Sequence, residues 1–415
     1  MEPNKNIWVF NHYAVTPDLP GGTRHFDFGK ELVKRGYKVT VFASSFQHGS
    51  MRYVKGFFKK DFIVEELEGV RFVWIKTFPY SGNNWRRVIN MLSYSVRAYK
   101  VARKLNIEKP DIVIGSSVHL FAVFTAYLLS KKYKTSFIME VRDLWPQTLI
   151  DMGMSKWHPF VILLGILEKF LYRRAAKIIT LLPKANEYIE KLDVPEEKIV
   201  WIPNGVDLGR FNFNEDNSNL KHDKSCFIIT YTGAIGKANN LDVLVKAADI
   251  LKTDYPEIKF LVVGDGPEKE KLVRIAMEKD LNNIEFNALV PKNEVSKILY
   301  KSDALFFNLK DSAVFKYGIS SNKLFDYLAS EKPIIFSSNS INNPVEEAEA
   351  GITVPPDNPE KLAEAVVELY KMSPEERKEI GMNGRRYVEK HHSIPNLVDK
   401  LEKIIEEICN RKSSN

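Results

Sequence analysis

Four turn segments combine glycine with a polar or charged side chain at the end of a β-branched run, an arrangement that suits a phosphate group. Glycine lets the backbone approach a ligand closely, and the unpaired N–H groups at the start of a following helix attract an anion. The segments begin at Gly21, Gly233, Gly264 and Gly318. For the first and the third of them, an ordinary turn remains an equal alternative.

The segment 316–329 is the most informative of the four. It reads Gly-Ile-Ser-Ser from Gly318 and leads into a helix expected to begin near Asn322. The helix N-terminus suits phosphate, and Lys323 adds positive charge. One turn further, Asp326 is placed to accept hydrogen bonds from ribose hydroxyls. A nucleoside diphosphate fits that order of groups.

The segment 231–237 places Gly233, Gly236 and Lys237 directly after a β-branched run. This pattern suits a phosphate held by backbone amides beside a cation. It matches neither the G-x-G-x-x-G dinucleotide fingerprint nor the Walker A loop. NAD-dependent enzymes and P-loop ATPases are therefore not favoured.

Two further turns of the second half are candidates for contact with a nucleotide. Gly264, Asp265 and Gly266 make a sharp turn at the end of a strand, followed by proline. The apolar residues Leu289 and Val290 follow another strand and are placed to flank a flat base, although ordinary core packing is equally open.

The elements that must position these turns alternate between buried strands and helices, which is typical of doubly wound α/β domains. The strands expected are 7–10, 39–43, 70–75, 112–115, 136–141, 178–181, 199–202, 227–232, 259–263, 284–286, 304–308 and 333–336. Most show no period-2 alternation, so a parallel sheet with both faces covered is expected. Ligands of such sheets bind outside the carboxyl ends of the strands.

A polar stretch at 208–225 interrupts the alternation and predicts a connecting loop. The expected organisation is therefore two Rossmann-like domains, 1–205 and 206–387, facing each other across a cleft. The final stretch, 374–408, predicts one or two amphipathic helices, and a helix at 388–410 is expected to pack back on the first domain.

Composition excludes several classes of protein. The chain has 415 residues, and 44% hydrophobic and 27% charged residues are ordinary globular values. Two cysteines, Cys226 and Cys409, cannot form a disulfide framework, and no C-x-x-C motif suggests zinc or redox chemistry. No apolar run has the length of a signal peptide or a transmembrane helix. A cytoplasmic protein is expected.

Charge is unevenly distributed along the chain. Residues 1–205 hold 31 Lys and Arg against 19 Asp and Glu, a net charge of +12, whereas the remainder has a net charge of −5. An anionic partner of the first half is indicated, unless its lysines only face water. Two cationic, amphipathic segments, 83–100 and 157–174, suit an anionic bilayer surface, with packing against the sheet as the open alternative.

Six segments taken together resemble the family 4 retaining glycosyltransferases of the GT-B fold, over nearly the whole length of the chain. They are 21–41, 140–147, 202–207, 232–244, 263–267 and 318–335. The branch is similar to surface-polysaccharide enzymes, including L-fucosamine transferases. The resemblance implies transfer of an N-acetylated amino or deoxy sugar from a UDP-linked donor to a lipid-linked or polysaccharide acceptor, with retention of configuration. The sequence has no D-x-D motif, so no metal or other cofactor is expected. A cytoplasmic enzyme working at the inner face of the cell membrane is expected.

The resemblance also assigns roles to residues. The family's E-x7-E pattern falls on Gly318 and Asp326, so Asp326 is expected to contact the ribose, and backbone amides of Ile319 to Asn322 are expected to replace the missing first acid. An Arg and a Lys that hold the diphosphate in many relatives are here Ala234 and Asn239.

The residues given a catalytic role by this argument are His119, Asp143, Lys237 and Lys323. The two lysines supply the cations that the family pattern lacks. Similar enzymes place the main chain of a histidine such as His119 towards the anomeric carbon, whereas a helix start is the structural alternative. Asp143 either orients the acceptor or caps the turn that follows it.

The residues expected to contact the donor are Gly21, Gly22, Gly233, Gly236, Lys237, Gly264, Asp265, Gly266, Leu289, Val290, Gly318, Ile319, Ser320, Ser321, Asn322, Lys323, Leu324 and Asp326. Two alternatives remain open: a nucleotide-sugar 2-epimerase of the same fold, and a non-catalytic subunit that binds a nucleotide sugar. A nucleic-acid partner is not expected, because no RNA- or DNA-binding motif is present.

Overall fold

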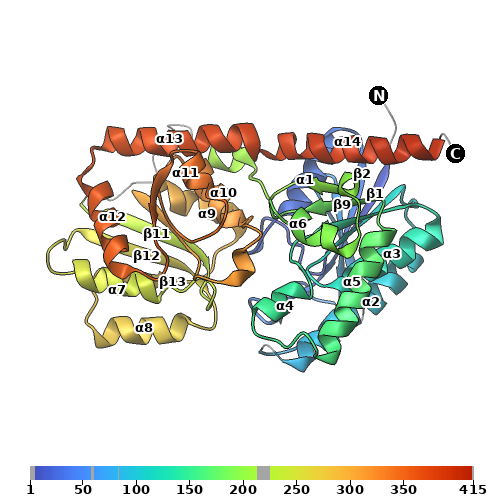
Figure 1. Cartoon of the computed structure of the whole chain (residues 1–415), viewed down its shortest axis with the longest axis horizontal. Coiled ribbons are helices and arrows are strands. Elements are labelled where there is room, and N and C mark those ends of the chain that lie inside the picture. The colour runs from blue at the N-terminus through green and yellow to red at the C-terminus, as the bar shows by residue number, and fades with distance from the viewer. Residues whose placement is uncertain (1–4, 58–59, 83, 213–224, 414–415) are drawn as a thin grey trace. The chain divides into compact units, whose positions relative to one another are not determined.

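The computed structural model describes residues 5–57, 60–82, 84–212 and 225–413. The chain forms two compact units (Figure 1). The first contains the described residues up to Thr16, Gly22–Pro203 and the residues from Ile394 onward. The second contains Pro17–Gly21 and Asn204–Ser393. Most of the expected connecting loop at 208–225 lies outside the described residues.

Among the described residues, the first unit is built on an eight-stranded sheet with the order β10-β9-β8-β7-β1-β2-β6-β5. Its strands are β1 (Asn6–Phe10), β2 (Lys38–Ser44), β5 (Phe62–Leu67), β6 (Val70–Ile75), β7 (Ile112–Ser116), β8 (Ser136–Val141), β9 (Lys177–Thr180) and β10 (Ile199–Trp201). The short strands β3 (Phe46–Gln47) and β4 (Arg52–Tyr53) pair separately. Strands such as β1 and β7 are buried along their whole length, as expected for a parallel sheet covered on both faces.

The edge strand β5 differs from the sequence-based expectation. It pairs antiparallel with β6 through a two-residue turn at Glu68 and Gly69, both of which have positive φ. Such primed turns match the twist of a hairpin. The strand escaped prediction because its side chains are half or fully exposed and so give no buried run.

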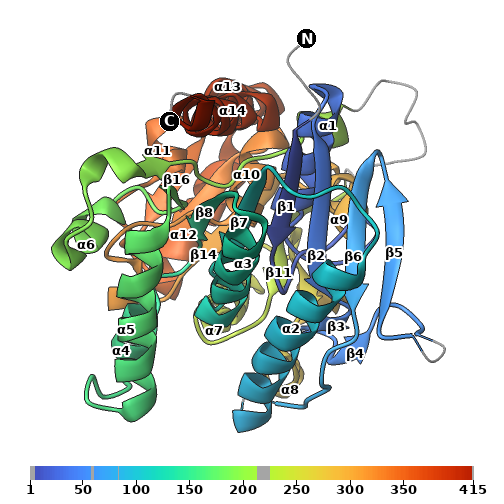
Figure 2. The same cartoon turned by 90° about the vertical axis from the view of Figure 1, so that its right-hand side faces the viewer.

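Helices cover both faces of this sheet. They are α1 (Arg24–Lys34), α2 (Trp85–Lys104), α3 (Leu120–Tyr133), α4 (Gln147–Asp151), α5 (Pro159–Arg174), α6 (Asn186–Ile189) and α14 (Ile394–Ser413), with short 3₁₀ turns η1 (Glu190–Leu192) and η2 (Glu196–Lys198). Helix α3 packs between α2 and α5, and the three lie side by side in Figure 2. Helix α1 packs against β2 and β6.

The last helix of the chain, α14, packs against α1 in this first unit. Its buried stripe includes Leu397, Leu401 and Ile405. At the end of α1, Arg35 donates to the carboxylates of Asp399 (2.7 Å) and Glu402 (2.8 Å). Apolar burial supplies most of the stability of this contact, because surface ion pairs contribute little.

Among its described residues, the second unit has a six-stranded, wholly parallel sheet with the order β13-β12-β11-β14-β15-β16. Its strands are β11 (Phe227–Ala234), β12 (Ile258–Asp265), β13 (Ile284–Asn287), β14 (Ala304–Asn308), β15 (Ile334–Ser337) and β16 (Gly351–Val354). Its helices are α7 (Asp242–Leu251), α8 (Lys269–Glu278), α9 (Lys292–Tyr300), α10 (Asn322–Ala329), α11 (Pro344–Glu347), α12 (Pro359–Lys371) and α13 (Pro374–His391), with 3₁₀ turns η3 (Leu208–Phe211) and η4 (Ala313–Phe315). The prediction of two doubly wound α/β domains is confirmed.

Several helix starts of this unit follow from their capping residues. Pro359 and Pro374 occupy the first turns of α12 and α13, where their missing N–H costs nothing. Asn358 and Ser373 accept backbone N–H groups as N-caps, and Ser373 forms a reciprocal capping box with Glu376. No helix within the described ranges is both long and apolar enough to cross a membrane.

Candidate functional site

The corner formed by residues 318–323, ahead of α10, carries the features expected of an anion site. Gly318 has φ +94°, a conformation that favours glycine, and turns the chain into the helix. Ser321 is the N-cap, but its side chain makes no capping hydrogen bond. The backbone N–H groups of Asn322 and Lys323 have no acceptor among the described residues. Free N–H groups at a helix start favour a negatively charged ligand.

Lys323 brings a positive charge to the same corner. Its Nζ donates to Tyr231 Oη (2.5 Å) and Asn239 Oδ1 (3.1 Å) and lies 4.1 Å from the centre of the Tyr231 ring. In the part of the chain that the structure describes, no carboxylate pairs with it. Burial lowers the pKa of Lys323 to about 7. An anionic ligand would supply the missing counter-charge.

The end of β11 and the loop that follows it reach this corner through Gly233 and Asn239. A side chain at Gly233 would meet Lys323 Nζ at 3.1 Å. Asn239 occupies the position at which many members of the family have a lysine. Its side-chain amide oxygen accepts a hydrogen bond from Lys323 Nζ. Lys237, in contrast, lies on an exposed part of this loop. The structure therefore brings Lys323, but not Lys237, into a partly buried position.

Gly264 and Gly266 lie where the neighbouring backbone leaves no room for a Cβ atom. A Cβ at Gly264 would lie 1.9 Å from the carbonyl oxygen of Gly233, and one at Gly266 would lie 2.3 Å from that of Ile235. The exposed Asp265 accepts from the N–H of Gly266 (2.8 Å). This turn allows the β11 loop to pack closely; its contact with a donor stays a prediction.

Asp326 faces a cation that the sequence analysis did not identify. Its carboxylate forms a short, buried ion pair with Lys292 at the start of α9. The exposed Leu289 and the half-buried Val290 lie in the preceding loop, just before α9. Lys292 was missed because it lies 34 residues from Asp326 and belongs to no motif.

The loop containing Gly21 groups with the second unit, whereas Gly22 groups with the first. Within the second unit, the carbonyl groups of Pro17 and Leu19 accept the first N–H groups of α9, from Asn293 (3.1 Å) and Lys292 (3.2 Å). The loop therefore caps a helix. Direct contact of Gly21 and Gly22 with a phosphate stays a prediction.

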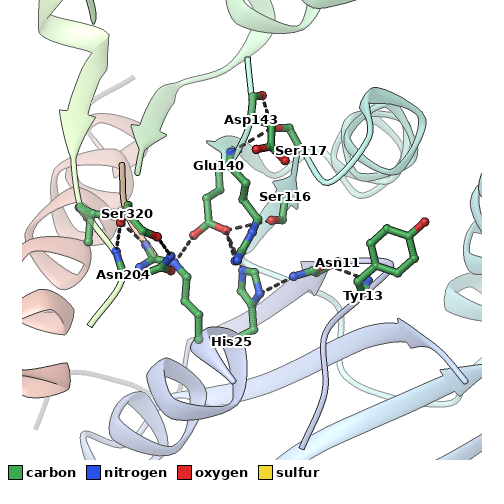
Figure 3. Close-up of polar contacts among 12 residues, drawn as sticks. Asn11, Tyr13, His25, Ser116, Ser117, Glu140, Asp143, Asn204 and Ser320 are labelled. Carbon is green, nitrogen blue, oxygen red and sulfur yellow. Dashed lines mark hydrogen bonds and ion pairs between the residues drawn. The ribbon is translucent and has the colours of Figure 1, made fainter. Parts of the chain in front are cut away.

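In the first unit, a buried ionic network lies at the carboxyl ends of β7 and β8 (Figure 3). Glu140 accepts from Arg24 Nε (2.8 Å) and Ser116 Oγ (2.9 Å), and its Oε1 lies 3.0 Å from His25 Nε2. His25 Nδ1 lies 2.8 Å from Asn11 Nδ2. Burial alone would raise the pKa of Glu140, but the charge of Arg24 holds it well below its ordinary value. The carboxylate is therefore ionised and fully partnered.

His119 is the N-cap of α3, and its imidazole belongs to a buried pair. Nδ1 accepts from the N–H of Ala122 (3.2 Å), so the proton is assigned to Nε2, which donates to His12 Nδ1 (2.8 Å). Burial, together with Arg87, lowers the pKa of His119 to about 3. The ring is therefore neutral and held in one orientation, which agrees with the alternative that His119 starts a helix.

Asp143 follows β8 in an exposed turn. Its carbonyl oxygen accepts from Ser117 Oγ (3.4 Å) and from the N–H of Trp145 (3.1 Å). Arg142 and Arg87 place positive charge near its carboxylate. Both roles expected for Asp143 remain predictions. Within the described ranges, no group of three or more His, Cys, Asp or Glu side chains is arranged to hold a metal ion.

The fold and the anion-receptive corner define a protein of the GT-B glycosyltransferase class. The family described as Glycosyltransferase Family 4 matches residues 21–210, and the family described as Glycosyl transferases group 1 matches residues 226–372. Together these matches cover most of both units. The chain belongs to the family 4 glycosyltransferases, as the resemblance of its sequence implied. The similarity to L-fucosamine transferases and the retention of configuration stay predictions.

Known relatives support the same assignment. The putative colanic acid biosynthesis glycosyl transferase WcaI of Escherichia coli is 25% identical over 248 residues, which span 57% of this chain and 60% of WcaI. Sucrose-phosphate synthase from Thermosynechococcus elongatus has a TM-score of 0.76 at 16% identity, covering 98% of this chain and 100% of that one. Anabaena HepE, solved in complex with UDP and glucose, has a TM-score of 0.68 at 12% identity, covering 97% and 100%. At these identities, the solved structures establish the fold alone.

Proposed function

We propose that the protein transfers a sugar from a UDP-linked donor to a hydroxyl group of a saccharide or lipid-linked acceptor, with retention of the anomeric configuration. The single observation that carries this proposal is Lys323, a partly buried ammonium with no carboxylate partner among the described residues, beside the free N–H groups that begin α10. The complex of HepE with UDP and glucose supports UDP as the nucleotide.

These groups suit the charge that develops during sugar transfer. As the bond between the anomeric carbon and the phosphate oxygen breaks, negative charge grows on the departing diphosphate. Fixed amides, a helix N-terminus and a lysine stabilise that charge without having to reorganise. In this proposal Asp326, whose carboxylate pairs with Lys292, accepts hydrogen bonds from the ribose hydroxyls.

The donor and acceptor classes rest on resemblance. The name of WcaI refers to biosynthesis of colanic acid, which favours a polysaccharide or its lipid-linked precursor as acceptor. An N-acetylated amino sugar or a deoxy sugar is the donor class that the sequence resemblance favours.

The test is calorimetric titration of the full chain with UDP and GDP, followed by product analysis with a panel of UDP-sugars. Binding of UDP and transfer to a saccharide acceptor are expected, with the anomeric configuration read by NMR. Activity is expected to survive EDTA. Failure of UDP to bind would overturn the proposal, and a free 2-epimerised sugar nucleotide as product would identify the alternative enzyme.

We also propose a peripheral contact with anionic membranes through α2 and α5. On α5 one apolar stripe packs inward, but Leu163 (53%) and Ile166 (66%) are exposed, as is Val96 (54%) on α2. Arg173 and Arg174 follow at the end of α5. Exposed apolar side chains flanked by cations suit a negatively charged bilayer surface.

Liposome flotation tests this contact. The protein is expected to float with vesicles containing phosphatidylglycerol and to stay behind with neutral phosphatidylcholine vesicles. The double variant Leu163→Ser/Ile166→Ser should lose the binding. Met277→Ser, which removes an exposed apolar side chain from α8 in the second unit, is the matched control. No flotation with either vesicle would refute the contact.

A further inference from the structure

The segment Ile-Pro-Asn-Gly-Val-Asp at 202–207 has no role in the function proposed above, yet it occupies a special place in the fold. The chain passes from the first unit to the second between Pro203 and Asn204. In the first unit, Arg24 donates to the carbonyl groups of Ile202 (3.0 Å) and Pro203 (2.5 Å). The contacts of Asn204 lie in the second unit, at the corner ahead of α10.

Asn204 holds Ser320 through two hydrogen bonds (Figure 3). Its backbone N–H donates to Ser320 Oγ (2.8 Å), and its Nδ2 donates to the carbonyl oxygen of Ser320 (2.5 Å). Asn204 is only 2% exposed. Its own carbonyl oxygen lies 3.2 Å from His392 Nδ1, and the His392 ring stacks on Phe325 of α10. Asn204 is therefore linked to α10 twice, at its N-terminus through Ser320 and along the helix through His392 and Phe325.

A second asparagine holds the neighbouring residue of the corner through its side chain alone. Asn342 Oδ1 accepts the N–H of Ile319 (2.8 Å), and its Nδ2 donates to the carbonyl oxygen of Ile319 (3.0 Å). Ser340 Oγ donates to Asn342 Oδ1 (3.0 Å) and fixes the amide. Two side-chain amides thus fix two consecutive residues of the corner.

We infer that Asn204 and Asn342 are positioning residues for the diphosphate of the donor. They fix Ile319 and Ser320, while the N–H groups of Asn322 and Lys323 stay without an acceptor among the described residues. A corner that is already ordered loses little conformational freedom when the phosphate binds, so more of the interaction energy appears as affinity. This inference rests on the proposed function.

The experiment compares UDP with uridine, because a positioning role for phosphate affects only the phosphorylated ligand. The variants are Asn204→Ala and Asn342→Ala; Asn342 is only half-buried, so its variant is expected to fold even if the other does not. UDP affinity is measured by calorimetry and uridine affinity by ligand-observed NMR. Each variant is expected to weaken UDP binding about tenfold, from loss of hydrogen bonds worth about 1.4 kcal/mol, and to leave uridine binding within about twofold.

The matched control is Asn283→Ala. Asn283 is buried and donates through Nδ2 to the carbonyl oxygen of Ala248 (2.8 Å). Like that of Asn204, its Oδ1 has no hydrogen-bond partner in the part of the chain that the structure describes. It precedes β13, at the opposite end of the strand from the ligand-binding edge, so its variant should lower the melting temperature without changing UDP affinity. The inference is wrong if the wild type binds UDP but Asn204→Ala and Asn342→Ala have the same ratio of UDP affinity to uridine affinity as the wild type. If the wild type does not bind UDP, the proposed function itself fails.

Discussion

The lysine at the start of α10 leads to a sharp prediction about pH. Lys323 has a pKa lowered to about 7 because it is buried, and the hydrogen-bond partners of its Nζ among the described residues, Tyr231 and Asn239, are neutral. A bound diphosphate brings negative charge beside Nζ and should restore the pKa towards its ordinary value. Binding of UDP above pH 7 therefore requires uptake of a proton.

The size of the effect follows from that difference in pKa. If the bound form keeps its proton up to pH 9, UDP affinity should fall about 50-fold between pH 7 and pH 9. The diphosphate of UDP keeps a nearly constant charge over this range, because the second ionisation of a phosphate lies near pH 6. Lys323→Arg, charged throughout, should bind UDP with little dependence on pH, and Lys323→Met should bind more weakly at pH 7 by about tenfold or more.

Folding stability should change in the opposite direction. Below pH 7 the ammonium is charged in both the folded and the unfolded state, so the full cost of burying it opposes folding. Between pH 7 and 10.5 the unfolded state binds more protons, so the free energy of unfolding rises with pH. Burial costs up to about 5 kcal/mol at 1.36 kcal/mol per pH unit.

Lys323→Met should therefore stabilise the protein by up to about 5 kcal/mol at pH 6, and this gain should vanish near pH 10.5. Calorimetry in two buffers of different ionisation enthalpy measures the proton uptake, and urea unfolding at each pH measures stability. A UDP affinity independent of pH between 7 and 9 in the wild type, or a Lys323→Met variant that is less stable at pH 6, would refute the reasoning.

Three further predictions concern the rest of the molecule. Lys237→Met should change UDP affinity less than threefold, because Lys237 is exposed and screened by water. A loss of UDP affinity as large as that of Lys323→Met in the same titration would give Lys237 an equal role. Glu168, buried in α5 beside Tyr188, has a pKa raised to about 8 by burial, so the free energy of unfolding should fall by up to about 5 kcal/mol as the pH rises from 4.5 to 8. Urea unfolding of Glu168→Gln should show no such dependence on pH. An unchanged dependence on pH in this variant would contradict the raised pKa of Glu168. Gly264→Ala should cost more than about 3 kcal/mol or prevent folding, because its Cβ would meet the Gly233 carbonyl, whereas Gly236→Ala, with open space around it, should stay within about 0.5 kcal/mol by thermal unfolding.

Much of the fold was predictable because its strands are continuous buried runs. The bounds of β6, β8 and β14, and of the helix that starts at Asn322, agree with the expectation residue by residue. The edge strand β5 was missed because its side chains face solvent. The short strand β16 was missed because its four residues are mostly half-exposed and form no apolar run.

The candidate site was predictable only where the chemistry lies within one segment. Gly318, Ser321 and Lys323 could be placed at a helix N-terminus because turn, cap and cation follow one another in the sequence. The partners that fix this corner come from distant segments, so no sequence motif could predict them. Lys292, which pairs with Asp326, and Asn204, which holds Ser320, are examples. In the first unit, the ion pair of Arg24 with Glu140 joins residues 116 positions apart.

The position of α14 has a consequence for the order in which the protein folds during synthesis. Because this helix follows the second unit in the sequence but packs on α1, the first unit cannot be complete until the ribosome has made the second unit and α14. Until then, the face of α1 that packs against α14 is uncovered. A fragment that ends at Pro203 should accordingly be prone to aggregate, and adding a synthetic peptide with the sequence of residues 394–410 should rescue it.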